Sequence, residues 1–278
     1  MKMKHKYFFL ALAAMAAGGI GLRAADHPVA MEPDGKWRVH DTNRPAPPVV
    51  TPGATFSQGA PAPSDAEVLF DGHGLDQWED PQGGPASWVT NGDYVISGTP
   101  GKTWAGGIRT KGKWADFQLH VEWAAPNPPT GTGQDRGNSG ILINNMYEVQ
   151  VLNNYENKTY ADGMAGGIYG QKPPLVNACK PPGDWQTYDI LFESPRWNDQ
   201  GELVKKACIT VLQNGVVVQN HYELAGMTDG INPLLHYHQT SKYGPPHPPE
   251  VFVQLQDHNN PVRFRNIWIR SQHLGSND

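Results

Sequence analysis

Strict alternation of apolar and polar residues is the clearest pattern along this chain. Residues 117–123 read Phe-Gln-Leu-His-Val-Glu-Trp, and residues 147–151 read Tyr-Glu-Val-Gln-Val. Residues 251–258 alternate in the same way, with Val251, Val253 and Leu255 at every second position. Successive side chains of a strand point to opposite faces of its sheet. We therefore predict three strands, each with one apolar face and one face that carries amide, carboxylate or imidazole groups.

Shorter runs of strand length fill most of the chain after residue 66. The pair Asn214-Gly215, between the runs 206–212 and 216–219, predicts a β-hairpin. The 278 residues include 31 Gly and 25 Pro, which weaken helix interiors, and no run predicts a helix of three turns. We expect about a dozen strands in an all-β, antiparallel β-sandwich of jelly-roll type over residues 65–272. The other strand runs are 94–97, 140–143, 167–169, 186–193 and 262–270.

Three further segments flank this predicted domain. Residues 1–25 join a basic start to an apolar run of about 16 residues, which predicts a signal peptide. That run is shorter than the roughly 20 residues of a membrane span, although an uncleaved anchor is the alternative. Residues 26–64 contain eight prolines and few bulky apolar residues, so we expect an extended leader that packs on the domain, with a free linker as the alternative. Residues 273–278 form a tail, and the whole pattern predicts a periplasmic or secreted protein.

Charge and cysteine content restrict the partners. Residues 1–25 carry four basic residues and no acid, so the rest of the chain has a net charge of −9 compared with −5 for the whole. Such an acidic surface disfavours nucleic acid, and membrane contact beyond the signal segment is not expected. Export would place Cys179 and Cys208 where disulfides persist, so the two could pair. Two separate buried thiols are the alternative.

If the three predicted strands belong to one sheet, their polar faces could together form the floor of a groove for a sugar. Amides and carboxylates hydrogen-bond hydroxyl groups, and aromatic side chains stack on the apolar face of a pyranose. The alternative is the ordinary solvated side of an antiparallel sheet. The sequence has no Walker loop, dinucleotide fingerprint, nucleophile elbow or zinc-protease motif. His236 and His238 could share a strand face as metal ligands, but no third ligand stands near them in the sequence.

A set of short motifs follows in fixed order from residue 67 to residue 270. They are Leu69-Phe-Asp-Gly72 with Leu75 and Trp78, Asp116-Phe-Gln-Leu119 with Glu122, Gly137-Asn-Ser-Gly-Ile141, Tyr147-Glu-Val-Gln150, Ile168-Tyr-Gly170, Trp185 with Tyr188-Asp-Ile190, Leu255-Gln-Asp-His258 and Val262-Arg-Phe-Arg-Asn-Ile267. The ordered set resembles the 3-keto-disaccharide hydrolase domain family. The resemblance implies a concanavalin A-like sandwich and hydrolysis of glycosidic bonds in sugars oxidised at C3. The chain departs from that family at Asn144 and Asn259, where many relatives have Arg and Gly.

The implied substrate defines what a catalytic site must contain. A ketone at C3 acidifies the proton on C2, so a base can remove this proton. The group on C1 can then leave with a proton from an acid, and water can add back to the double bond. Glu148 and His258 are the candidates for base and acid, in either order. Glu122 is a third candidate acid, unless it forms a buried ion pair with an arginine. The candidate substrate contacts are Gln150, Asn138, Tyr169, Trp185, Gln256 and Arg265, and a divalent cation could stabilise the enolate instead of protein groups.

We therefore expect an exported hydrolase that acts on 3-keto-glycosides. A carbohydrate-binding module without catalysis is the alternative, because a fold does not determine a function. A retaining glucanase is disfavoured, because such an enzyme needs a pair of carboxylates and Glu148 is followed by Val149 and Gln150.

Overall fold

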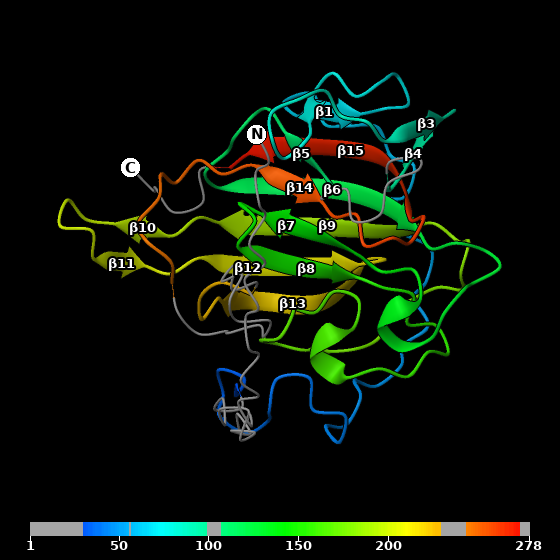
Figure 1. Ribbon diagram of the computed structural model, residues 1–278, viewed down its shortest axis with the longest axis horizontal. Coiled ribbons are helices and arrows are strands. Elements are labelled where there is room, and N and C mark those ends of the chain that lie inside the picture. Colours follow the sequence, from blue (N-terminus) through cyan, green and yellow to red (C-terminus); the bar gives the residue numbers. More distant parts are fainter. Residues whose placement is uncertain (1–29, 56, 99–106, 229–242, 273–278) are drawn as a thin grey trace, which may run out of the picture.

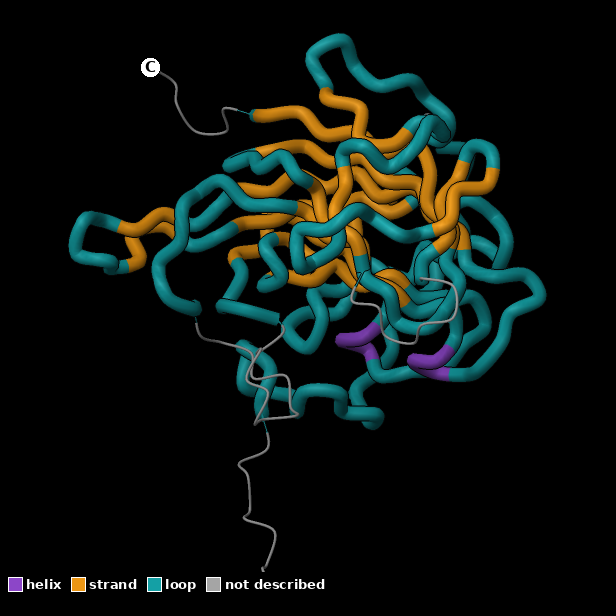
Figure 2. The backbone as a smooth tube through the Cα atoms, turned by 45° about the horizontal axis from the view of Figure 1, so that its top comes forward, coloured by secondary structure: helices purple, strands orange, loops and turns teal. Residues whose placement is uncertain are grey.

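Two antiparallel β-sheets pack face to face in the computed structural model (Figures 1 and 2), which describes residues 30–55, 57–98, 107–228 and 243–272. The larger sheet contains β1 (Glu67–Phe70), β3 (Val89–Asn91), β4 (Tyr94–Ile96), β6 (Phe117–Ala124), β9 (Gln186–Glu193), β12 (Cys208–Gln213), β13 (Val216–Glu223) and β15 (Arg263–Ser271). The smaller sheet contains β2 (Trp78–Glu79), β5 (Ile108–Thr110), β7 (Ser139–Ile143), β8 (Tyr147–Val151) and β14 (Val253–Leu255). The prediction of an all-β antiparallel sandwich is confirmed.

The strand order differs strongly from the sequence order. The larger sheet runs β13-β12-β9-β6-β15-β4-β3, with β1 also paired to β15, and the smaller runs β2-β5-β14-β7-β8. A separate two-stranded ribbon, β10 (Arg196–Trp197) and β11 (Leu203–Lys205), projects from one end of the sandwich (Figure 1). Among the described residues the helical elements are two short 3-10 turns, η1 (Gly133–Asp135) and η2 (Ala161–Gly163). No helix in these ranges is long and apolar enough to cross a bilayer.

Alternation correctly assigned the buried face of each strand. Phe117, Leu119, Val121 and Trp123 of β6 lie in the core, as do the alternate residues of β8 and β14. The possibility that these three polar faces form one floor is wrong, because β6 belongs to the larger sheet and β8 and β14 belong to the smaller. The polar residues of β6 therefore lie on the opposite side of the sandwich from those of β8. Alternation tells which residues of a strand share a face, but not which sheet contains the strand.

Positive backbone φ angles explain why one strand prediction is correct and another is wrong. Asn214 and Gly215 both have positive φ, 53° and 78°, as a two-residue hairpin turn requires, and they join β12 to β13 as predicted. Residues 167–169 are not a strand, because Gly166 and Gly170 have φ of 75° and 67° and fold the segment into turns. Ile168 makes only isolated bridges there.

The leader contacts both sides of the sandwich. The backbone of Val50 bonds to Asn177, and the Ser57 hydroxyl donates to Asp189 on β9 at 2.9 Å. The Gly59 N–H donates to the Glu122 carboxylate on β6. Residues 1–25 and 273–278, and also His236 and His238, lie outside the described residues.

The two cysteines are both free thiols, so the possible disulfide between them is not formed. Cys208 begins β12, whereas the Cys179 sulfur accepts a hydrogen bond at 3.1 Å from Gln213, which ends the same strand. Five strand residues span about 17 Å, which is far beyond the roughly 7 Å between Cα atoms that a disulfide can bridge.

Candidate active site

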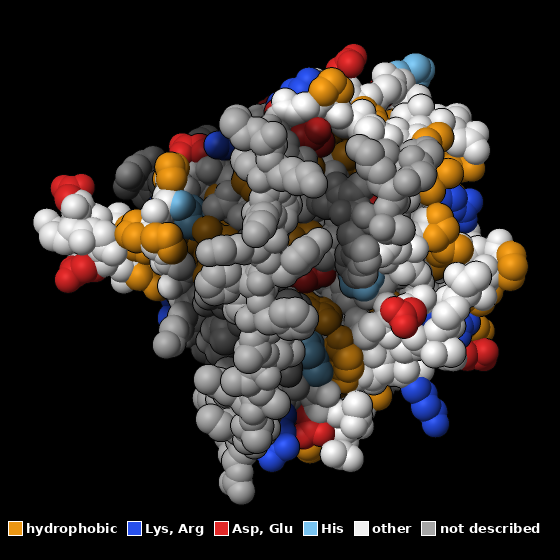
Figure 3. Space-filling view, in the orientation of Figure 1, with side chains coloured by type: hydrophobic (Ala, Val, Ile, Leu, Met, Phe, Trp, Pro, Cys, Tyr) orange, Lys and Arg blue, Asp and Glu red, His pale blue; other side chains and the backbone are white. Residues whose placement is uncertain are grey.

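The outer face of the smaller sheet carries a row of acidic and amide side chains. Tyr147 and Val149 point into the core, so Glu148 and Gln150 point outward, and both are almost fully buried. Gly140 stands opposite Gln150 on the neighbouring strand β7. A methyl group at Gly140 would lie 2.4 Å from the Glu148 carboxylate, so the carboxylate lies over this glycine. Figure 3 shows this face of the molecule, with acidic and histidine side chains near its middle.

The amides around Gly140 form a network that leaves two acceptors open. Gln134 accepts a hydrogen bond from Gln150 at 3.0 Å through its side chain, and from Asn138 at 2.7 Å through its backbone carbonyl. The Gln256 backbone N–H donates to the Gly140 carbonyl, which places Gln256 beside the same glycine. Within the described part of the chain, the buried Oε1 atoms of Gln150 and Gln256 accept no hydrogen bond. A ligand with hydroxyl groups would satisfy both acceptors.

His258 lies three residues after the end of β14, where the charge of Asp135 in η1 acts on its ring. Its side chain is half-buried, and this burial lowers the pKa of the imidazole despite the opposing effects of Asp135 and Asp257. The ring is therefore neutral near pH 7 and able to accept a proton. Asn259 adopts φ 56°, so this asparagine takes the left-handed conformation that glycine adopts most readily.

A pair of tyrosines borders Glu148 at the edge of the sheet. The Tyr169 N–H donates to the Glu148 carbonyl at 3.1 Å, and the Tyr169 hydroxyl lies 2.6 Å from that of Tyr160. Burial raises the pKa of Tyr160 to about 12, and the charge of Glu148 adds to the shift. Burial raises the pKa of Tyr169 as well, again with a contribution from Glu148. Both hydroxyls therefore stay protonated at neutral pH, and one of them donates its hydrogen bond to the other.

The leader adds a histidine to these tyrosines. The His40 ring lies 4.2 Å from the Tyr160 ring and 4.9 Å from the Tyr169 ring. Asp162, which is fully buried, accepts the His40 backbone N–H at 2.9 Å and the ring Nδ1 at 3.1 Å. Both contacts to one carboxylate fix the orientation of the ring. The sequence analysis missed His40, Asp162, Tyr160 and Gln134, because each comes from a loop or from the leader and no local pattern links it to β8.

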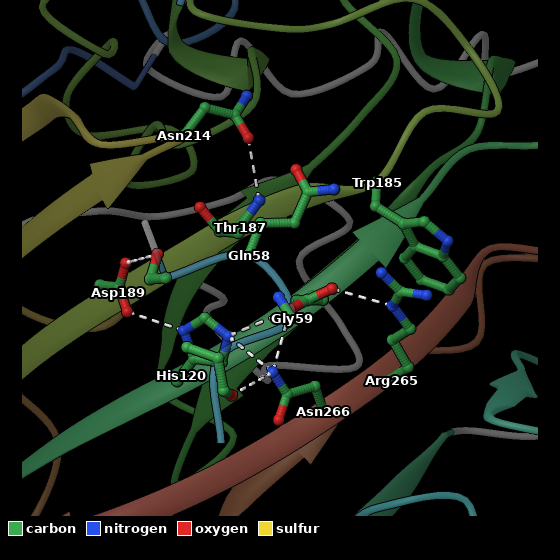
Figure 4. Close-up of polar contacts among 12 residues, drawn as sticks. Gln58, Gly59, His120, Trp185, Thr187, Asp189, Asn214, Arg265 and Asn266 are labelled. Carbon is green, nitrogen blue, oxygen red and sulfur yellow. Dashed lines mark hydrogen bonds and ion pairs between the residues drawn. The ribbon is translucent and has the colours of Figure 1, made fainter. Parts of the chain in front are cut away.

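Three of the candidate site residues, Glu122, Arg265 and Trp185, lie on the opposite side of the sandwich from Glu148. Glu122 projects from β6 on the outer face of the larger sheet and accepts a hydrogen bond at 2.8 Å from Arg265, which Figure 4 shows beside Trp185. The Arg265 guanidinium lies 4.1 Å from the centre of the Trp185 ring. Glu122 is thus the acid of a buried ion pair, the alternative already considered for it, and Trp185 stacks on an arginine.

Glu122 lies in a cluster of hydrogen-bonded charged and polar side chains that also contains His120, Asp189, Asn266 and Arg265. Burial raises the Glu122 pKa, but hydrogen bonds from His120, Asn266, Gly59 and Arg265 outweigh it and bring the pKa to about 2. Burial lowers the His120 pKa, but the contacts with Asp189 at 2.7 Å and with Glu122 outweigh this effect and raise the pKa. The cluster therefore favours a charged carboxylate at Glu122 and a bound proton at His120, and Gly59 and Ser57 of the leader complete its hydrogen bonds.

Gln150, Asn138 and Gln256 thus lie around Gly140 with the Glu148 carboxylate, Tyr169 bonds to the Glu148 backbone, and His258 follows β14; these residues belong to the motifs 137–141, 147–150, 168–170 and 255–258. Residues 65–270 match the family of 3-keto-alpha-glucoside-1,2-lyase-like domains. The chain belongs to this family. The matched stretch includes both sheets and all six of these side chains, whereas His40 and the rest of the leader precede it.

Solved structures support the family membership. A candidate glycosyl hydrolase from Parabacteroides distasonis is 44% identical, with a TM-score of 0.67, and the match covers 82% of this chain and 93% of that one. A second candidate glycosyl hydrolase from the same organism is 17% identical, with a TM-score of 0.51 and coverage of 74% and 94%, and shows the same fold. A comparison with curated proteins gave no match. The family and these neighbours indicate a carbohydrate-active, glycosyl hydrolase-like domain.

Proposed function

We propose that this protein cleaves glycosidic bonds of 3-keto-sugars by removal of the C2 proton, elimination and hydration. The observation that carries the proposal is the set of open amide acceptors beside a buried carboxylate. Among the described residues, the Oε1 atoms of Gln150 and Gln256 have no partner; they lie on either side of Gly140, over which the Glu148 carboxylate lies. Sugar hydroxyls are donors that fit these acceptors, whereas phosphate or sulfate groups at neutral pH are acceptors themselves.

The residues supply two groups for proton transfer. In the proposal His258, which burial keeps neutral, takes the proton from C2 and leaves an enolate on the C3 oxygen. The enolate expels the group on C1, and Glu148, which enters this step in its protonated form, gives its proton to the departing oxygen and becomes a carboxylate. Water then adds to C1 of the enone and a proton returns to C2, which gives the free 3-keto-sugar.

The tyrosine pair is suited to the developing charge. Tyr160 and Tyr169 are kept protonated by burial and lie next to the Glu148 segment. A neutral hydroxyl that donates to an enolate oxygen stabilises the charge without a proton transfer. His40, held by Asp162 against both rings, orients this pair in the proposal.

The test compares a 3-keto-glucoside with its unoxidised parent glucoside as substrates of the purified protein. We expect cleavage of the keto sugar alone. Glu148→Gln and His258→Ala should each lower kcat by about 100- to 10,000-fold, the usual contribution of a general acid or base. Glu202→Gln is the matched control, because this exposed carboxylate lies between β10 and β11, outside both sheets, and its replacement should leave kcat unchanged.

Two outcomes would reject the proposal. Binding of the sugar without cleavage of either compound would make the protein a carbohydrate-binding module. Equal cleavage of both sugars would remove the role of the ketone. We also propose export to the periplasm or the medium, which N-terminal sequencing of the mature protein would test.

A further inference from the structure

Three different metal-ligand groups converge at one end of the larger sheet, away from the candidate active site. The Cys208 sulfur lies 3.2 Å from Nδ1 of His221, and the same nitrogen lies 3.9 Å from an oxygen of Glu193. All three ligand atoms lie within 4.8 Å of one another. In the described ranges this is the one group of three or more His, Cys, Asp or Glu residues with such spacing.

Strand pairing brings the three residues together. Glu193 ends β9 and Cys208 begins β12, and the two are direct partners in the antiparallel register. Ile209 and Val211 point into the core, so Cys208 points to the outer face of the sheet. His221 comes from the third strand, β13, which pairs with β12 on its other side.

An irregularity in β13 aims the histidine at the cysteine. The register with β12 shifts between Ile209 and Val211, so one extra residue of β13 stands opposite Thr210. His221 has φ 45°, a conformation that costs free energy in residues other than glycine, and its N–H donates to the Thr210 hydroxyl at 2.9 Å. Bulges of this kind commonly redirect a side chain near functional sites.

The distances fit a tetrahedral metal site. With Zn–S near 2.3 Å and Zn–N near 2.05 Å, sulfur and nitrogen ligands stand roughly 3.6 Å apart, and nitrogen and oxygen ligands roughly 3.3 Å apart. The observed separations differ from these values by about 0.4 and 0.6 Å, which a rotation of the exposed His221 side chain can supply. Thiolate, imidazole and carboxylate together are typical ligands of Zn²⁺.

We propose that Glu193, Cys208 and His221 bind a Zn²⁺ ion, with water in the fourth position. On binding, the Cys208 thiol loses its proton to solvent, and the neutral His221 ring donates its Nδ1 lone pair. Lys205 bonds the other oxygen of Glu193 at 2.7 Å, so it orients the carboxylate and leaves the oxygen that faces His221 for the ion. The ion would join β9, β12 and β13.

Titration of the metal-free full-length protein with Co²⁺ tests the site. A thiolate that ligates Co²⁺ gives a charge-transfer band in the near ultraviolet, and we expect this band to saturate at one equivalent and to disappear when Zn²⁺ is added. Cys208→Ser should abolish it. Cys179→Ser is the matched control and should keep it, because the second thiol lies at the far end of β12. The band reports on a cysteine, so its outcome is independent of any activity on sugars.

His221→Gln is a second variant, which keeps the test valid if Cys208→Ser fails to fold. The His221 side chain is 73% exposed, so its replacement should not disturb the fold. It should weaken Zn²⁺ binding by about 100-fold or more, beyond the usual effect of losing an outer partner of a ligand. The proposal fails if the wild-type protein shows no thiolate band. It also fails if the band survives in Cys208→Ser, or if His221→Gln binds Zn²⁺ as tightly as the wild type.

Discussion

Replacing Gly140 by alanine should move the Glu148 carboxylate without removing it. The new methyl carbon would lie 2.4 Å from Oε1, 3.1 Å from Cδ and 3.2 Å from Cγ of Glu148. An ordinary carbon–oxygen contact is about 3.4 Å, so the carboxylate must move by about 1 Å. The displaced atoms are the end of a flexible side chain, so the strand itself need not shift.

The size of the effect follows from that displacement. A misplacement of about 1 Å at a reacting group can cost on the order of 100-fold in rate. We therefore expect kcat toward a 3-keto-glucoside to fall about 100-fold in Gly140→Ala. The free energy of unfolding should change by less than about 1 kcal/mol, because alanine also removes the entropic cost of glycine in a strand.

Steady-state kinetics and urea denaturation of the same preparations measure both quantities. Gly53→Ala is the matched control, because a methyl group at Gly53 meets no atom within 4 Å and its φ is not left-handed. The reasoning is refuted if Gly140→Ala keeps the wild-type kcat while Glu148→Gln is inactive. In that case the carboxylate acts from a position other than the one over Gly140.

Three further predictions concern the larger sheet and the thiols. Glu122→Gln should lower the free energy of unfolding in urea by about 3 kcal/mol, because it leaves the charge of Arg265 without its buried partner; an unchanged value would mean that the ion pair is solvated. Stability should be greatest between about pH 4.5 and 6.5. Because the pKa of His120 is raised in the folded state, its contribution to the free energy of unfolding is complete below pH 6.5 and is lost at higher pH. Because the pKa of Glu122 is lowered to about 2, its contribution is complete above pH 4.5 and is lost toward pH 2. His120→Gln should flatten the alkaline side of a urea stability profile, and an identical profile would contradict this. Without reductant, the denatured protein should react with two equivalents of a thiol reagent, one each at Cys179 and Cys208, whereas a disulfide would give none.

The sequence predicted which side of each strand is buried, because alternation is a local property of the extended chain. It could not distinguish Glu122 from Glu148, since both stand between apolar residues in alternating strands. Their difference comes from strand order: β6 pairs with β9 and β15, whereas β8 pairs with β7. Those pairings join residues far apart in the chain, and no short window of sequence contains them.

Some residues that contact the candidate site also could not be predicted from the sequence. Gln134 binds both Asn138 and Gln150 from a 3-10 turn, and no periodic pattern marks it. Gly140 belongs to the motif 137–141, but the reason for a glycine there is visible only in the structure, where the Glu148 side chain lies over it. A motif thus identifies residue types that are needed, and the packing shows what each one is needed for.

The leader extends the folded unit beyond the family match, which begins at residue 65. Its Gly59 N–H satisfies the Glu122 carboxylate on one outer face, and its His40 pairs with the buried Asp162 on the other. A hydrogen bond to a charged group contributes about 1.5–3 kcal/mol to stability. Each of these two acids would therefore be destabilised if the chain began at residue 65. The same leader that seals the ion pair of the larger sheet also supplies the histidine against the two tyrosines beside Glu148, so the stability of one face and the geometry of the other depend on a single segment.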